Sequence, residues 1–524
     1  MSDTTAPHLR LAAGYLARGL VAPAHAELDA LVAVAPRDPR TRLLAARIAL
    51  REDRVRDATR EALEAAQRAA ADSLLLLAVV DMLLQVGEVV AARRCMVDPV
   101  LADAHDAECL LRLARYRRRL DENAEALRLV ERAIAAGADS PQARFDYGVQ
   151  LYFNGCLADS GIELKASLRG NPRLGRVALA WARLGRRTAD DNDLELFGSG
   201  LEQVAKGTCD HAALLFALYK ELEDVGRDDE AWRALVAGNA VMHARRPWDA
   251  DGHARYLDKL MEACGTERVA PRNAVDVGPQ PIFILGMPRS GTTVLECMLA
   301  NHSAVASAGE LTDFGMQLHW AADTANTRGD AFIARLAELD FPQVGRRYLA
   351  QTRWRARGKA FFIDKQPPNW VVAGLVHAAL PGARILHLVR DPMDVCFSTW
   401  RAFFGDTYAF SYDMATLAAY YRGYRRTLAH WHAVMPGAIL DVAYADLVRE
   451  PEATLRSVFD FCGLPFEPGC SDITRNTAPS ATLSAAQVRS PVHARAFGEW
   501  QRYAAQLAPL QATFADIRIE DAPA

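Results

Sequence analysis

The sequence of 524 residues lacks three features that would assign it at once to a class of protein. Its nine cysteines include no Cys-x-x-Cys pair, which argues against a zinc ribbon or a dense disulfide framework and favours a reducing, cytoplasmic location. No stretch approaches the roughly 20 apolar residues that span a bilayer, and the N-terminus has no signal-peptide pattern, so we expect no membrane span. The formal net charge of -4 provides no global basic field for binding nucleic acid.

What is present is an ordinary globular composition, with 51% hydrophobic and 24% charged residues. At roughly 100 to 200 residues per domain, the length predicts two to four domains.

A period of 34 residues runs through the N-terminal part of the chain. A small residue recurs at this spacing: Ala24, Ala58, Ala92, Ala126 and Ser160. Five positions before each of them lies a turn-forming residue: Gly19, Asp53, Gly87, Asp121 and Gly155. The pattern predicts two antiparallel helices per unit, crossing so closely that only small side chains fit between them.

The period resembles that of the tetratricopeptide repeat family. We place units near residues 5, 39, 73, 107 and 141, a degenerate helical stretch over 175–211, and a further unit from 212, which together make an α-solenoid over 5–264. The resemblance implies a groove for an extended peptide or a protein partner. A scaffold or oligomerisation module without a ligand is the alternative.

A linker is expected over 265–280, and a second domain over 281–515. Its first segment, Pro281–Leu285, is a continuous apolar run typical of a strand in a parallel sheet. The loop Gly286–Thr293 follows, and then apolar residues at helical spacing. Strand, glycine-bounded loop and helix together form a phosphate-binding arrangement. Because Thr292 occupies the lysine position of a nucleotide-triphosphate loop, an ATPase or kinase is disfavoured, and Arg289 supplies the positive charge instead.

A second anion motif follows another predicted strand, Ala383–Val389. Arg390 comes directly after it, at the strand end where open α/β sheets bind ligands. Two anion sites on neighbouring strand ends imply a ligand with two separated anionic groups. An ion pair between Arg390 and Asp391 is the structural alternative.

This pair of motifs resembles the sulfotransferase superfamily, whose donor is 3′-phosphoadenosine 5′-phosphosulfate. The resemblance spans about residues 281–510 and implies a P-loop-like, three-layer α/β domain with a central parallel sheet. It implies that Arg390 and Ser398 bind the 3′-phosphate. The residues expected at the 5′-phosphosulfate are Pro288, Arg289, Ser290, Gly291, Thr292 and Thr293.

In motif order the tyrosylprotein sulfotransferase branch is the most similar. The resemblance implies a catalytic base at Glu310 and a catalytic lysine at Lys365. It further implies a catalytic serine at Ser484 and an adenine-side tyrosine at Tyr444. The chain departs from the branch at Thr312, where the branch has a basic residue, which puts recognition of acidic peptides in doubt.

A second departure concerns a phosphate-binding lysine before a proline. Here Ser490 precedes Pro491, and we assign the lysine's role to Arg489.

The chemistry of sulfuryl transfer needs the same residue types. A base must take the acceptor's proton, and positive charge must stabilise the departing phosphate. Glu310 suits the first task, and Lys365, Arg289 and Ser484 suit the second; no metal is required. Two histidines are rival bases, but His387 is expected in a buried strand and His302 at a helix end.

The sequence therefore predicts transfer of a sulfuryl group to a hydroxyl, with a tyrosine of a peptide or protein as the first choice of acceptor. A carbohydrate, lipid or small phenol is the alternative acceptor. Two other classes stay open: a nucleotide-binding repeat adaptor without catalysis, and a phosphotransferase that uses ATP.

Overall fold

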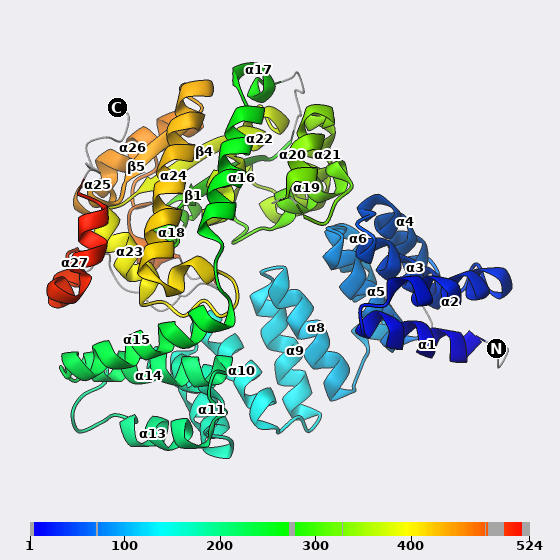
Figure 1. Ribbon diagram of the computed structural model, residues 1–524, viewed down its shortest axis with the longest axis horizontal. Coiled ribbons are helices and arrows are strands. Elements are labelled where there is room, and N and C mark those ends of the chain that lie inside the picture. Colours follow the sequence, from blue (N-terminus) through cyan, green and yellow to red (C-terminus); the bar gives the residue numbers. More distant parts are fainter. Residues whose placement is uncertain are drawn as a thin grey trace.

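The computed structural model describes residues 5–69, 72–271, 278–326, 329–476, 478–479 and 497–515. Up to residue 271 the described chain is entirely helical (Figure 1). The helices are α1(Thr5–Ala17), α2(Val21–Val34), α3(Pro39–Arg51), α4(Val55–Ala66), α5(Ser73–Gln85), α6(Val89–Met96), α7(Pro99–Ala102), α8(Ala107–Arg119), α9(Asn123–Ala135), α10(Pro141–Phe153), α11(Leu157–Gly170), α12(Gly175–Ala182), α13(Leu194–Gln203), α14(Cys209–Asp224), α15(Asp228–Arg245), α16(Ala250–Ala263) and α17(Thr266–Val269).

The predicted helix pairs and their close contacts are confirmed. The five small residues at the 34-residue spacing are fully buried at the crossings. A second set with the same spacing begins the first helix of successive units: the side chains of Asp38, Asp72, Asp106 and Ser140 accept backbone N–H groups at the N-caps of α3, α5, α8 and α10. No helix in the described part of the chain combines the length and apolarity needed to cross a bilayer.

The C-terminal part contains one parallel sheet with strand order β2-β3-β1-β4-β5. The strands are β1(Gln280–Gly286), β2(Val305–Ser307), β3(Phe361–Lys365), β4(Arg384–Val389) and β5(Ile439–Ala443). The central strand β1 is apolar throughout because both of its faces are covered, as predicted for Pro281–Leu285. It pairs directly with β4, so the two expected anion motifs do follow neighbouring strands.

Helices cover both faces of the sheet and make three layers (Figure 1). Ile282 and Ile284 pack with α18 and α26 on one face, and Phe283 and Leu285 face the larger core on the other. The helices of this part are α18(Thr292–Ala300), α19(Asp313–Ala322), α20(Asp330–Arg335), α21(Phe341–Thr352), α22(Ala373–Ala379), α23(Pro392–Trp400), α24(Met414–Val434), α25(Tyr444–Arg449), α26(Pro451–Cys462) and α27(Ala504–Thr513).

The last long helix of the N-terminal part, α16, packs along α24 of the C-terminal part (Figure 1). Asp258 forms an ion pair with Arg426 at 2.9 Å, and Leu257 lies against Gly423, where a Cβ would approach it to 2.8 Å. The helical region predicted over 5–264 therefore includes one helix that belongs by its packing to the sheet-containing part.

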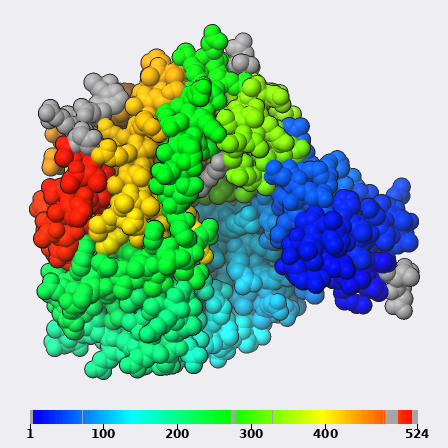
Figure 2. Space-filling view, in the orientation of Figure 1, coloured from blue at the N-terminus to red at the C-terminus, as the bar shows by residue number. Residues whose placement is uncertain are grey.

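The array also contacts the C-terminal part through a row of turns, which we call the docking edge: Asp53, Gly87 and Asp121. Asp53 accepts a hydrogen bond of 2.7 Å from the hydroxyl of Thr324, and the carbonyl of Gly87 accepts one of 3.2 Å from Gln317. These turns were predicted from the 34-residue period, but their contacts were not. Figure 2 shows the blue, cyan and green helices packed directly against the light-green and yellow segments.

Candidate active site

The phosphate-binding loop lies between β1 and α18, as its spacing predicted. Gly291 has a φ of 106°, and a Cβ there would lie 2.3 Å from the ring of Tyr444, so only glycine fits. The buried hydroxyl of Ser290 has no hydrogen-bond partner among the described residues. Thr292 and Thr293 begin the nine-residue helix α18, whose N-terminus faces the loop. The loop thus offers the backbone at Gly291 and a helix N-terminus to an anion.

The two predicted anion sites meet at the ends of β1 and β4. Arg390 donates a hydrogen bond of 2.9 Å to the carbonyl oxygen of Arg289. Arg289 in turn directs its Nε to the hydroxyl of Ser398 at 3.4 Å. Arg390 also stacks over Tyr444, 4.8 Å from the ring centroid. Asp391 caps α23 by accepting the backbone N–H of Asp394, which is its evident structural role.

Positive charge is concentrated around Arg289. Burial and the neighbouring cations Arg401, Arg183 and Arg390 lower the pKa of Arg289 to about 10, so it remains charged at neutral pH. Arg401 is paired with Glu499. Cations crowded together in a partly buried site favour a ligand with several negative charges.

Glu310 and Lys365 form an ion pair at the ends of β2 and β3. Lys365 is the last residue of β3 and is fully buried, whereas the side chain of Glu310 is 44% exposed. The ammonium group of Lys365 bonds to Oε1 of Glu310 and lies 3.7 Å from Oε2 of Glu296. Burial alone would lower the pKa of Lys365, but the two carboxylates outweigh it and raise the pKa. Lys365 therefore stays cationic beside an accessible carboxylate.

Two acidic residues behind this pair were missed by the sequence analysis. Glu296, on α18, is buried and accepts a hydrogen bond of 2.6 Å from Ser307. Asp121, on the docking edge, lies against Gly309, where a Cβ would approach its carboxylate to 2.3 Å. Burial and the nearby Glu296 raise the pKa of Asp121 to about 7. An acidic residue among the apolar residues that follow the loop was a signal from which Glu296 could have been predicted as a site residue. Asp121 was predicted only as a turn residue.

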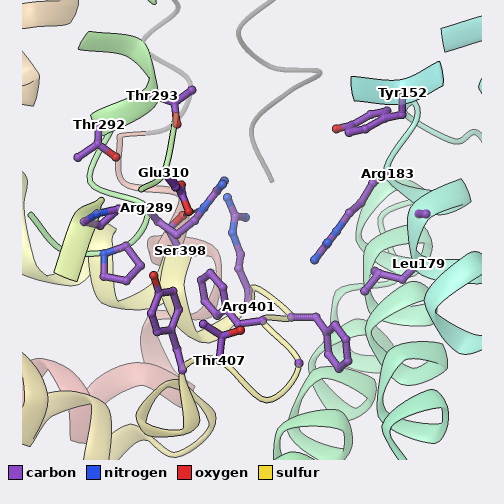
Figure 3. A pocket seen from close by; sticks show the side chains of 18 of the residues that line it. Tyr152, Leu179, Arg183, Arg289, Thr292, Thr293, Glu310, Ser398, Arg401 and Thr407 are labelled. Atoms are coloured by element: carbon purple, nitrogen blue, oxygen red, sulfur yellow. Dashed lines mark hydrogen bonds between the residues drawn. The ribbon is translucent and has the colours of Figure 1, made fainter. Parts of the chain in front are cut away.

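The loop, the arginines and Glu310 line a single cavity of about 650 Å³. Its volume is within the range of small-molecule sites. The opposite wall comes from the helical array, which the sequence analysis did not predict (Figure 3). The residues of that wall include Val149, Tyr152, Phe153, Leu179 and Arg183.

The remaining predicted residues lie elsewhere. Ser484 and Arg489 fall outside the described residues. His387 is buried and hydrogen-bonded to Asp441 at 2.7 Å, and the buried His302 contacts the carbonyl oxygen of Pro465 at 2.9 Å. Neither histidine lines the cavity. Of the three residues considered as bases, only Glu310 lines the cavity.

One group of described residues has the spacing of metal ligands: His387, His432 and Asp441. Asp441 already contacts both imidazole rings, and none of the three lines the cavity.

Comparison with known proteins agrees with this geometry. Residues 281–468 match the family model described as "Sulfotransferase family". An uncharacterized protein of Aquifex aeolicus is 28% identical over 332 residues, which cover 62% of this chain and 44% of that protein. Nodulation protein NoeE of Sinorhizobium fredii is 31% identical over 139 residues, which cover 24% of this chain and 33% of that protein. The chain thus spans less than half the length of these two curated relatives.

Among solved structures, the sulfotransferase domain from the curacin biosynthetic pathway is 21% identical, with a TM-score of 0.29. The match covers 44% of this chain and 98% of that domain. Residues 281–468 are thus similar to the sulfotransferase family, and they lie in an α/β part with a central parallel sheet, preceded by an all-helical region.

Proposed function

We propose that the chain is a sulfotransferase that moves the sulfuryl group of 3′-phosphoadenosine 5′-phosphosulfate to a hydroxyl, and that the hydroxyl belongs to a tyrosine in a peptide or protein. The observation that carries the proposal is the single cavity lined by the phosphate-binding loop, the Arg289–Arg390 pair and Glu310, with Lys365 bonded to Glu310 behind the cavity wall. The family match over residues 281–468 supports the same class of reaction.

The residues of the cavity fit a donor with two anionic ends. The backbone at Gly291 and the N-terminus of α18 suit the 5′ end. Arg390 and Ser398, beside the end of β4, suit the 3′-phosphate. Tyr444, stacked under Arg390, suits the adenine side.

The donor supplies an activated sulfuryl group. Glu310 accepts the proton of the acceptor hydroxyl as the new sulfur–oxygen bond forms. Lys365 and Arg289 donate hydrogen bonds to the charge that grows on the phosphate oxygen as the old sulfur–oxygen bond breaks. In the resting site Glu310 and Glu296 raise the pKa of Lys365, so this donor is charged when the reaction begins.

A tyrosine acceptor is favoured by the walls of the cavity. Phe404 and Tyr408 lie edge to face at 4.9 Å, and Tyr152 and Phe153 face the cavity from the array. Aromatic rings stack well on other aromatic rings.

Incubation of the full-length protein with sulfur-labelled donor and a cell extract tests the proposal. We expect label on protein tyrosine, and we expect Glu310→Gln to reduce transfer by about 100-fold or more while the affinity for adenosine 3′,5′-bisphosphate is kept. Label confined to a glycan, lipid or small phenol would contradict the tyrosine acceptor. No transfer to any component, with nucleotide still bound, would favour a non-catalytic adaptor.

A further inference from the structure

The helical array places one arginine in the cavity without a counter-charge. Arg183 follows α12 and points across the cavity toward the loop and the arginines of the sheet-containing part (Figure 3). Among the described residues its guanidinium group has no hydrogen-bond or ion-pair partner, although its backbone N–H donates to Leu179. By contrast, Arg187 on the same segment is held by Glu221 at 3.3 Å, and Arg401 is held by Glu499.

Burial lowers the pKa of Arg183 to about 10, and the titratable groups that face it are the phenols Tyr152 and Tyr412 and the guanidinium of Arg289 across the cavity. No carboxylate contributes to its environment. A partly buried guanidinium without an anion has lost hydration and gained no compensating pair, which is characteristic of a site that is completed by a ligand.

The donor nucleotide already has its own binding groups on the other wall. The loop and the Arg390–Ser398 pair all come from the sheet-containing part. Arg183 instead stands beside Tyr152, Phe153 and Leu179, on the wall that the array contributes. An anion bound there would approach from the acceptor's side.

We propose that Arg183 binds a carboxylate of the acceptor, so that the helical array selects hydroxyl compounds that carry an anionic group near the hydroxyl. The inference rests on the proposed function, because it names the class of acceptor for that same site. Its ligand would form a bidentate, charge-assisted hydrogen bond, for which an arginine is well suited.

Binding to the dead-end complex tests this inference without requiring turnover. The full-length protein is saturated with adenosine 3′,5′-bisphosphate and titrated with 3-(4-hydroxyphenyl)propionate and, separately, with its uncharged amide. We expect the wild type to bind the acid about 10- to 100-fold more tightly than the amide. Arg183→Gln should abolish that difference, Arg183→Lys should keep part of it, and none of these variants should change the affinity for the bisphosphate.

Arg186→Gln is the matched control, since this exposed arginine lies three residues further along the chain, outside the cavity. It removes the same charge and should change neither affinity.

Three results would overturn the inference. The first is equal affinity of the wild type for the acid and the amide, including no binding of either, and the second is an equal loss of affinity for both probes in Arg183→Gln. The third is a loss of bisphosphate affinity in that variant, which would assign Arg183 to the donor. Failure of the proposed function would show differently, as absence of label transfer by the wild type.

Discussion

Gly291 is the residue of the phosphate-binding loop that tolerates least change. Its positive φ disfavours any side chain, and the ring of Tyr444 occupies the space that a Cβ would need. We expect Gly291→Ala to lower the free energy of unfolding by roughly 2 kcal/mol and to weaken binding of adenosine 3′,5′-bisphosphate. Denaturant unfolding and calorimetry measure the two effects.

Gly315→Ala is the control, because a Cβ there meets no atom within 4 Å and the residue lies inside α19. This variant should be slightly stabilising, by about 0.5–1 kcal/mol. Unchanged nucleotide affinity in Gly291→Ala would contradict the role given to the loop.

Lys365 has a structural and a chemical role that can be separated. Lys365→Met should leave Glu296 buried without a cation, and we expect about 3 kcal/mol of lost stability together with about a 100-fold loss of transfer rate. The double variant Glu296→Gln, Lys365→Met should regain stability in denaturant unfolding but not the rate in a single-turnover assay. Recovery of the rate would show that Lys365 acts only by neutralising Glu296.

Much of the site could be predicted residue by residue, and the reason is local. Arg390 directly follows β4 and Arg289 lies three residues after β1, and strand ends in a parallel sheet meet at one edge, so the sequence predicted that they lie close together. Arg183 could not be predicted in this way. Its position depends on how the array folds back on the sheet, which no local pattern records.

At the scale of elements, the docking edge connects the array to the loop that carries Gly309 and Glu310. Asp121, in the turn between α8 and α9, has Gly309 against its carboxylate, and Gly309 directly precedes Glu310. Arg355 donates a hydrogen bond of 2.6 Å to the carbonyl oxygen of Leu120 in the same turn. The position of the loop that carries Glu310 therefore depends on a turn more than 180 residues away in the sequence.

Asp121 should make stability depend on pH. Its pKa is about 7 in the folded chain and 3.8 in the unfolded one, and the charged groups that face it are Glu296, Arg355 and Lys365. Between these two pKa values the folded chain binds more protons than the unfolded chain. The stability contributed by protonated Asp121 is therefore complete below about pH 4 and is lost as the pH rises to 7. The slope is about 1.4 kcal/mol per pH unit.

Asp121→Asn should therefore be more stable than the wild type at pH 8, with a smaller difference at pH 5, when both are unfolded in denaturant. Asp53→Asn, on the same edge, is the control: it removes one of the two oxygens that accept hydrogen bonds from Thr324 and Ala325, and its effect on stability should be the same at pH 5 and pH 8. If the free energies of unfolding of wild type and Asp121→Asn changed with pH in parallel, this result would contradict the burial of the carboxyl group of Asp121.

The elements themselves followed from the sequence where periodicity was strong. The 34-residue spacing located the helix pairs because it reflects contacts within each unit, and the apolar runs located β1 and β4. The packing of α16 on α24 was not predicted, since an amphipathic helix shows that one face is covered and not which neighbour covers it.

At the scale of the whole molecule, the array from Leu164 onward and the sheet-containing part share one continuous hydrophobic core. Phe216, on α14, packs edge to face against Phe403 at 5.4 Å, and Trp232, on α15, lies 5.0 Å from Trp400. The cavity lies between the two parts, with donor groups on one wall and Arg183 on the other (Figure 3). The array therefore forms one wall of the cavity.

We propose that Arg289 and Arg390 bind the two ends of one doubly anionic adenosine compound. Calorimetry of the full-length protein with adenosine 3′,5′-bisphosphate and with adenosine 5′-monophosphate tests it most directly. We expect the bisphosphate to bind at least 10-fold more tightly, and Arg390→Ala to remove that advantage without changing the affinity for the monophosphate. Equal affinities for the two nucleotides in the wild type would contradict the claim.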